Sequence, residues 1–418
     1  MQDSYEKITL PNGVRIIFEK IPYLRSVSAG IWVGTGSRYE KAEHSGISHF
    51  IEHMLFKGTK TRSAAELARL VDGSGGQSDA FTSKETTCYY GKTLDTNLAL
   101  LLDVLCDMFF NHDFRDDTLE SERGVILEEI DMYEDTPEDL AAERLFREAF
   151  RGSALARPIL GSPSALAKMT PETLNNHMAE HYLGGSTVVA LSGSFDRANI
   201  DWLCEKFAAM KPGREKKPRK AQYTPTFTAK AKPIEQNHIC VAFPSVSFRD
   251  KERYAVQLLS SILGGGMSSR LFQKLREELG LCYSVYTFSS SHEDTGLFGI
   301  STALGADTED TALSAIADEV KKLADDGVTE EELSRAREQV KSGVIMSLES
   351  SSARMNRLAR GELLFGEIVP AEELIERYNA VTREDILAAA RRVFTAPASL
   401  SCVGKVRPSE EYREKFVI

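Results

Sequence analysis

Two histidines and a glutamate stand in an otherwise apolar stretch near the amino end of the chain. The segment SGISHFIEHMLFKG, Ser45 to Gly58, contains His49, Glu52 and His53. If the segment is helical, the two histidines lie one turn apart on one face, and Glu52 borders that face. Large apolar side chains fill the other faces, so the helix must be buried. Burying imidazoles and a carboxylate is costly unless they are paired, which favours a shared cation, and imidazole nitrogens suit zinc.

The alternative is a pair of core histidines that form separate hydrogen bonds. The pattern H-x-x-E-H also occurs a second time, at His177, Glu180 and His181. That segment, TPETLNNHMAEHYLGG, has polar residues around its histidines and only a narrow apolar stripe. It therefore predicts a half-solvated surface helix, in which water satisfies the polar groups and nothing requires a metal.

A catalytic zinc usually has three protein ligands and one open position, so two histidines do not complete a site. Residues 116–133 predict a helix in which Glu122 and Glu129 are seven residues apart and lie on nearly the same face. Either carboxylate is a candidate ligand. Glu128 points about 100° away and is expected to be solvated. Periodicity alone leaves open the alternative that Glu122 and Glu129 are both surface charges.

The elements that must position these residues are marked by cap and turn signals. Ser45 or Ser48 can cap the metal-binding helix, and Gly58 can end it. Pro-Asn-Gly at 11–13 lies between two strand-like runs and predicts a β-hairpin. The other elements that we expect in this half are a strand at 27–34, a helix at 63–73 that opens with a capping box, a strand at 78–93 and a helix at 94–110.

Length and composition bound the class of protein. The 418 residues suggest two or more domains, and 42% hydrophobic and 27% charged residues are ordinary for a globular protein. The net charge of -11 argues against a nucleic-acid binder, so we expect no nucleic-acid partner. Six cysteines occur without a C-x-x-C pair, which fits reduced thiols that do not bind zinc: Cys88, Cys106, Cys204, Cys240, Cys282 and Cys402.

No export or membrane signal is visible in the sequence. The first nine residues, MQDSYEKIT, include an acidic residue and lack the apolar core of a signal peptide. The longest apolar run, 98–110, is interrupted by Asp103 and Asp107 and is too short to cross a bilayer. We therefore expect a cytoplasmic protein without a membrane partner.

The two halves of the chain look related. A basic stretch with several prolines at 211–233 is typical of an exposed linker, and beyond it the sequence pattern restarts. An acidic helical segment, for example, follows in each half at a corresponding place. We infer two domains of similar αβ topology, at 1–210 and 234–418.

Within these two domains, one pair of segments can be aligned directly. The segment that starts at His53 can be aligned with the segment that starts at Ser261. Their sequences are HMLFKGTKTRSAAELARL and SILGGGMSSRLFQKLREE. The alignment places Gln257, Ser260 and Ser261 opposite the two histidines and the glutamate of the first domain. Glutamine and serine are not usual zinc ligands. Only the first domain is therefore expected to bind zinc at this place.

HFIEH followed by ERGVILEEIDM resembles the inverted-motif zinc peptidases of the pitrilysin and insulinase family, in particular their two-domain processing-peptidase branch. The resemblance spans nearly the whole chain. It implies an α+β fold of two tandem homologous αβ domains, each a mostly antiparallel sheet packed with helices. It also implies one zinc ion per chain, bound by His49, His53 and Glu129, since the third ligand of the family follows the glutamate of the motif by about 77 residues. Glu52 would be the catalytic base, and Glu122 a supporting catalytic residue.

A second group of candidate residues lies in the second half. Residues 268–279 predict a helix that Gly280 stops, and a strand is expected at 281–288. Arg276 and Tyr283 flank this turn, and their R-x6-Y spacing resembles an arginine and a tyrosine that the family directs at the carbonyl groups of the bound peptide. Without the family, Arg276 is a solvated helix charge and Tyr283 a packing residue of the strand.

The resemblance implies a zinc-dependent endopeptidase that cleaves peptides or unfolded segments with metal-activated water inside a dimeric chamber. Substrate would add as a strand to the edge at 77–82, where Asp79 replaces the asparagine of most relatives. We expect a homodimer, and a heterodimer with a metal-free relative is the alternative. Arg276 and Tyr283 can act in their own chain or across to the partner. The rival function is a non-catalytic structural or binding subunit of the same fold.

Overall fold

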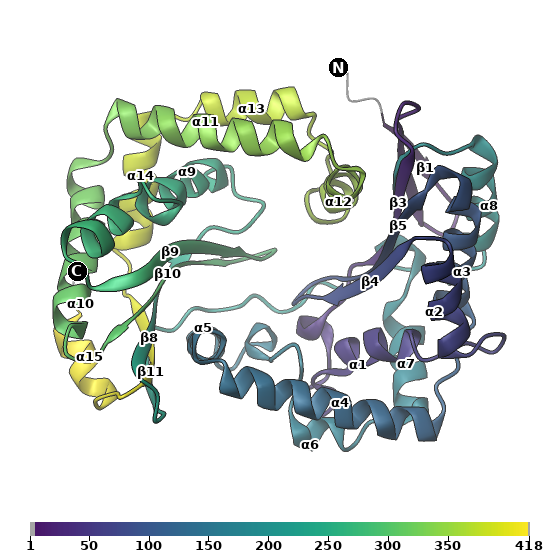
Figure 1. The fold of residues 1–418 in the computed structure, drawn as a ribbon, viewed down its shortest axis with the longest axis horizontal. Coiled ribbons are helices and arrows are strands. Elements are labelled where there is room, and N and C mark those ends of the chain that lie inside the picture. The colour runs from purple at the N-terminus through teal and green to yellow at the C-terminus, as the bar shows by residue number, and fades with distance from the viewer. Residues whose placement is uncertain (1–4, 417–418) are drawn as a thin grey trace. The chain divides into compact units, whose positions relative to one another are not determined.

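The computed structural model describes residues 5–416, whose contacts group them into two compact units (Figure 1). Unit 1 contains the described residues up to Ile130, together with Arg157–Arg219 and Ile345–Pro370. Unit 2 contains Asp131–Ala156, Lys220–Val344 and the described residues from Ala371 onward. Each unit therefore includes one segment from the opposite half of the sequence. The domain boundaries expected from the sequence, 1–210 and 234–418 with a linker between them, divide the chain differently and stay a prediction.

Unit 1 is built on a six-stranded sheet with the order β1-β2-β6-β3-β5-β4. Its strands are β1 (Glu6–Thr9), β2 (Arg15–Lys20), β3 (Ser26–Val33), β4 (Gln77–Thr82), β5 (Thr87–Leu94) and β6 (Thr187–Gly193). All neighbours are antiparallel except β2 and β6. The hairpin predicted around 11–13 is confirmed. The single strand predicted at 78–93 is wrong, because a tight turn, in which the Ser83 N–H donates to the Thr86 carbonyl over 2.7 Å, divides it into β4 and β5.

Unit 2 is built on a five-stranded sheet with the order β7-β11-β8-β10-β9. Its strands are β7 (Phe227–Ala231), β8 (Gln236–Ser245), β9 (Cys282–Ser291), β10 (Gly296–Gly305) and β11 (Ser399–Gly404). Only β7 and β11 run parallel. The order and directions match those of β2-β6-β3-β5-β4 in the first sheet, strand for strand. The predicted α+β class, with two related and mostly antiparallel sheets, is confirmed.

The helices of unit 1 cover both faces of its sheet. They are α1 (Ile47–Leu55), α2 (Ala64–Gly73), α3 (Leu98–Phe110), α4 (Asp116–Asp135, whose last turn belongs to unit 2), α6 (Pro163–Leu166), α7 (Pro171–His181), α8 (Arg197–Phe207), α12 (Ser351–Arg360) and the π-helix η7 (Gly361–Phe365). Side chains alternate along the strands, so Ile16 and Ile31 join the large core under α1 and α3, whereas Ile17 and Trp32 join a smaller core under α12.

The helix α12 comes from the second half of the sequence but belongs to unit 1. Met355 and Leu358 of α12 are fully buried against the sheet. Arg354 forms a buried ion pair with Glu19 of β2, and the Ser351 hydroxyl lies 2.9 Å from the Ser28 hydroxyl of β3. Both polar contacts are shielded from water and well matched, so they fix where α12 lies on the sheet.

Unit 2 is organised in the same way. Its helices are α5 (Pro137–Ala149), α9 (Arg253–Gly264), the π-helix η6 (Phe272–Glu278), α10 (Glu309–Asp326), α11 (Glu330–Ser347, whose last turn belongs to unit 1), α13 (Ala371–Asn379), α14 (Arg383–Phe394) and α15 (Ser409–Lys415). The helix α5 comes from the first half of the sequence, and its Leu140 and Leu145 pack on Cys240 and Val403 of the second sheet. Short 3-10 helices complete the connections: η1 (Ser37–Tyr39), η2 (Ala42–His44), η3 (Asp95–Asn97), η4 (Ala154–Ala156) and η5 (Gly184–Ser186).

No helix within residues 5–416 combines the length and the apolar character that a membrane crossing requires.

Candidate metal centre

The site is centred on α1, which is buried along nearly its whole length. Within this helix only Glu52 and His53 are partly exposed. The helix begins after Gly46, whose φ of 96° is left-handed and therefore suits glycine. The prediction that a serine caps this end is wrong, because neither Ser45 nor Ser48 accepts a capping hydrogen bond with its side chain. The first free amides of α1 instead donate to the carboxylate of Glu40.

The imidazoles of α1 meet a carboxylate from α4. The Nε2 atoms of His49 and His53 each lie 3.6 Å from Oε2 of Glu129. One ligand atom from each of these residues lies within 4.8 Å of the other two, and this is the only such group of potential metal ligands among residues 5–416. Predicted ligands from two distant parts of the sequence are therefore brought together in unit 1.

These three residues fit a zinc ion. A tetrahedral zinc with bonds of about 2.1 Å separates its ligand atoms by about 3.4 Å, close to the spacing of the histidine nitrogens and the glutamate oxygen. Oε2 of Glu129 is buried and accepts no hydrogen bond from any described residue, so a cation would satisfy it. Burial, aided by the neighbouring imidazole of His53, lowers the pKa of His49 to about 3. His49 is therefore neutral at pH 7, as a metal ligand must be.

Glu122 lies on α4 about two helical turns before Glu129, and it supports this group of residues. Its side chain is almost fully buried, and its Oε1 lies 2.9 Å from Nδ1 of His53. Its Oε2 lies 2.8 Å from the ammonium of Lys57, which balances the buried charge. Because Nδ1 of His53 donates to Glu122, Nε2 of the same ring keeps its lone pair and points at the group. The alternative that Glu122 is a surface charge is therefore wrong, whereas Glu128 is exposed as predicted.

Glu52 lies beside the three clustered residues. Its Oε2 accepts a hydrogen bond of 2.5 Å from the Thr82 hydroxyl on the edge strand β4. Burial raises the pKa of Glu52, and the hydrogen bond from Thr82 and the imidazole of His53 partly oppose this. The carboxylate is thus oriented and only partly exposed, and it remains free to exchange a proton.

The second copy of the motif lies on α7 and, within residues 5–416, is not part of a group of three potential metal ligands. His181 Nδ1 is 2.6 Å from Oε2 of Glu215, and Glu180 is exposed, as the surface-helix prediction requires. His177 differs from that prediction because it is buried against α1, with its Nε2 3.5 Å from the Ser48 hydroxyl. Burial lowers the pKa of His177 well below its usual value, so this histidine is a neutral packing residue.

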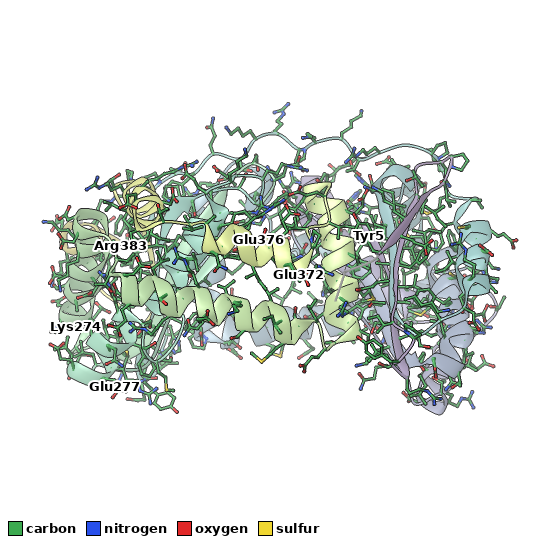
Figure 2. All side chains as sticks on the ribbon, turned by 90° about the horizontal axis from the view of Figure 1, so that it is seen from above. Tyr5, Lys274, Glu277, Glu372, Glu376 and Arg383 are labelled. Carbon is green, nitrogen blue, oxygen red and sulfur yellow. The ribbon has the colours of Figure 1, made fainter. Side chains whose placement is uncertain are left out.

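Arg276 and Tyr283 lie together in unit 2. Arg276 is on the π-helix η6, which lies within the predicted helical segment 268–279. Lys274 and Glu277 of the same helix are labelled in Figure 2. The guanidinium of Arg276 lies 4.6 Å from the ring centroid of Tyr283 and 4.8 Å from that of Phe272. Tyr283 is 77% exposed, so it is not a packing residue of the strand β9. The predicted pair therefore forms a solvent-facing cation–π contact.

Three contacts of this site were not predicted from the sequence: those of Lys57, Thr82 and Glu40. Lys57 follows His53 by four residues, so helical spacing could have indicated it. Thr82 and Glu40 reach α1 from other elements, and no local pattern marks them.

Comparison with known proteins matches both halves of the chain. A family model described as Insulinase (Peptidase family M16) matches residues 15–163, and one described as Peptidase M16 inactive domain matches residues 168–340. The protein named uncharacterized zinc protease YmxG of Bacillus subtilis is 39% identical over 95% of this chain and 98% of its own length. An uncharacterized zinc protease of Streptomyces coelicolor is 37% identical over 98% of this chain and 92% of its own.

Two solved structures share the fold. The peptidase M16 inactive domain from Pseudomonas fluorescens superposes with a TM-score of 0.89 at 19% identity and covers 97% of this chain and 99% of that one. A protease from Helicobacter pylori superposes with a TM-score of 0.87 at 22% identity and covers 97% of this chain and 100% of that one.

Proposed function

The chain belongs to the insulinase family of peptidases, peptidase family M16, and on this premise we propose that it is a zinc-dependent endopeptidase acting on peptides or unfolded segments. The observation that carries the proposal is the convergence of His49, His53 and Glu129 on one place in unit 1. Relatives that align over nearly the whole chain and are named zinc proteases support it.

His49, His53 and Glu129 would bind one zinc ion per chain, with one coordination position left open. When bound, zinc supplies a Lewis acid that makes water more acidic and polarises a carbonyl group. Glu122 orients the ring of His53 through the hydrogen bond to Nδ1, and it increases the basicity of the other ring nitrogen.

Glu52 is proposed as the general base. Its carboxylate, oriented by the Thr82 hydroxyl, takes a proton from the attacking water and later gives it to the leaving amine. The edge of β4 that carries Thr82 pairs with no other strand of the described sheet, so an extended peptide can add to it through backbone hydrogen bonds. Asp79 is an exposed residue of the same strand.

Arg276 and Tyr283 are proposed to bind the carbonyl groups of the peptide. Both side chains carry donors, and Tyr283 is open to solvent in unit 2. By resemblance to two-domain relatives we propose a homodimer that encloses the substrate, in which the pair acts in its own chain or across to the partner. Light scattering of the purified chain tests the homodimer, and a monomer that binds a metal-free relative would favour the heterodimer.

The two copies of the motif provide a matched test of the function. Glu52→Gln should retain zinc but lose cleavage of an unfolded protein substrate by about 1,000-fold, because the general base is gone. Glu180→Gln, the same change in the second copy, should leave both properties as in the wild type. Zinc content by mass spectrometry and cleavage by chromatography measure the two outcomes. A structural or binding subunit would show neither bound zinc nor cleavage that depends on Glu52.

A further inference from the structure

The first turn of α1 presents backbone N–H groups that no residue of the helix itself can accept. A side chain at the N-cap normally accepts one of them, but the N-cap here is Gly46. The carboxylate of Glu40 takes this role from outside the helix. Its Oε2 accepts from the Gly46 N–H over 2.7 Å, and its Oε1 accepts from the Ser48 N–H over 2.9 Å. A negative charge at this end also interacts favourably with the helix dipole.

Glu40 is itself held firmly. It follows the 3-10 helix η1, where Arg38 forms a buried ion pair of 2.6 Å with Glu85. The side chain of Arg157 donates to the backbone carbonyl of Glu40. Glu40 is only 3% exposed. The carboxylate therefore has little freedom to follow α1 if the helix moves, and it acts as a fixed anchor.

The backbone at the start of α1 is also closely packed. Gly46 packs directly on Gly161: a Cβ at residue 46 would come within 2.7 Å of the Leu160 carbonyl, and one at residue 161 within 2.2 Å of the Ser45 carbonyl. The close approach of Gly161 and the two hydrogen bonds to Glu40 thus both restrain the start of α1. A shift of the start of α1 would therefore disturb close contacts or break hydrogen bonds.

We propose that Glu40 is a positioning residue for the metal centre, which fixes the first turn of α1 so that His49 and His53 meet Glu129 in register for one ion. The proposal rests on the proposed function. His49 directly follows Ser48 in the anchored first turn, so a shift of that turn moves its Nε2 relative to Oε2 of Glu129. Glu40 is not among the three candidate ligands, so it would act on the site only through the helix.

Glu40→Gln separates positioning from simple packing. Glutamine has the size of glutamate, but its terminal amide has only one oxygen that accepts. The NH2 group in place of the second oxygen donates and cannot accept. One of the Gly46 and Ser48 N–H groups would then face another donor, and the first turn must shift or lose a hydrogen bond. Burial raises the pKa of Glu40 to about 7 against the opposing backbone hydrogen bonds, so the comparison belongs at pH 8, where wild-type Glu40 is charged.

Glu309→Gln provides the matched control. Glu309 is a buried carboxylate of unit 2 that accepts from Asn237 over 2.6 Å and pairs with Arg407 at 2.8 Å. The same carboxyl-to-amide change there should lower thermal stability while leaving the metal centre untouched. Any loss of zinc affinity that merely follows loss of stability would appear equally in both variants.

The experiment measures zinc affinity of the folded apoprotein by competition with a chromophoric chelator, and the visible absorption of the cobalt(II) form. Glu40→Gln should weaken zinc binding by about tenfold and change the cobalt spectrum, whereas Glu309→Gln should do neither. Wild-type affinity and spectrum in Glu40→Gln would overturn the proposal. If Glu40→Gln does not fold, Glu40→Asp, which shortens the side chain by one methylene, provides the same comparison. A wild-type protein that takes up no zinc would instead overturn the proposed function.

Discussion

His53 uses its two ring nitrogens for different purposes. Nε2 faces the other two candidate ligands, and Nδ1 donates to Glu122, which Lys57 in turn neutralises. A buried carboxylate that orients a histidine in this way is a recurrent support of zinc sites, where its loss lowers metal affinity by 10–100-fold. The same pairing without a metal would leave the buried Oε2 of Glu129 without a partner.

We therefore expect Glu122→Gln to weaken zinc binding by about 10–100-fold, because its amide makes His53 less basic and is poorly matched to the ammonium of Lys57. Chelator competition measures the affinity. Glu128→Gln, an exposed neighbour on the same helix, is the control and should bind zinc as the wild type does. Equal affinities for both variants would mean that Glu122 has no part in the site.

Some features of the site residues could be predicted from the sequence, and others could not. The apolar setting of His49 and His53, set against the polar setting of His177 and His181, predicted which copy of the motif is buried as a whole. Periodicity could not choose between a ligand and a surface charge for Glu129, and only the family spacing did so. The burial of His177 was not predicted because it depends on how α7 packs on α1, which the local sequence does not encode.

At the scale of the elements, the groups that cap a helix end determine where that helix begins and how it is held. Capping by the residue next to a helix is visible in a sequence, and the capping box of Ser63 and Glu66 at α2 was predicted from it. The cap of α1 was not, because Glu40 approaches it across a loop. The turn between β4 and β5 was missed as well, since residues 83–86 contain no glycine, proline or asparagine.

A helix start in unit 2 gives a prediction about pH. Glu332, near the start of α11, accepts from Arg270 over 2.6 and 2.9 Å and from the Thr329 N–H over 2.8 Å. Burial alone would raise the pKa of Glu332, but these hydrogen bonds outweigh it and lower the pKa to about 2. A carboxyl group whose pKa is lower in the folded protein stabilises the fold above its unfolded pKa of 4.5, and this contribution is lost as the pH falls toward 2.

Wild-type apoprotein should consequently lose about 1 kcal/mol more unfolding free energy between pH 6 and pH 3 than the Glu332→Gln variant. Urea unfolding at the two pH values measures the difference. Glu331→Gln removes an exposed neighbouring carboxylate and should keep the wild-type dependence. A Glu332→Gln variant with the full wild-type loss of stability would contradict the assignment.

The whole molecule repeats one αβ topology, and the repeat could be predicted from weak but ordered similarity between the halves. The matching strand orders of the two sheets confirm it. The membership of α5 in unit 2 and of α12 in unit 1 was not predicted, because both helices are amphipathic and their sequences do not specify which sheet they cover. Buried pairs such as that of Arg354 with Glu19 are decided by tertiary structure.

This topology places the candidate metal centre entirely in unit 1, between a helix that precedes β4 and one that follows β5. The corresponding helices of unit 2 are α9 and α11, and α9 carries Gln257, Ser260 and Ser261 where the alignment expects the metal-binding residues. The two units thus share one topology, and at this position only unit 1 has side chains that suit zinc.

Anomalous diffraction at the zinc absorption edge, from crystals of the zinc-loaded protein, tests the central claim most directly. We predict one strong peak per chain within bonding distance of Nε2 of His49, Nε2 of His53 and a carboxylate oxygen of Glu129. The absence of a peak there, or a peak beside His177 and His181 instead, would contradict it.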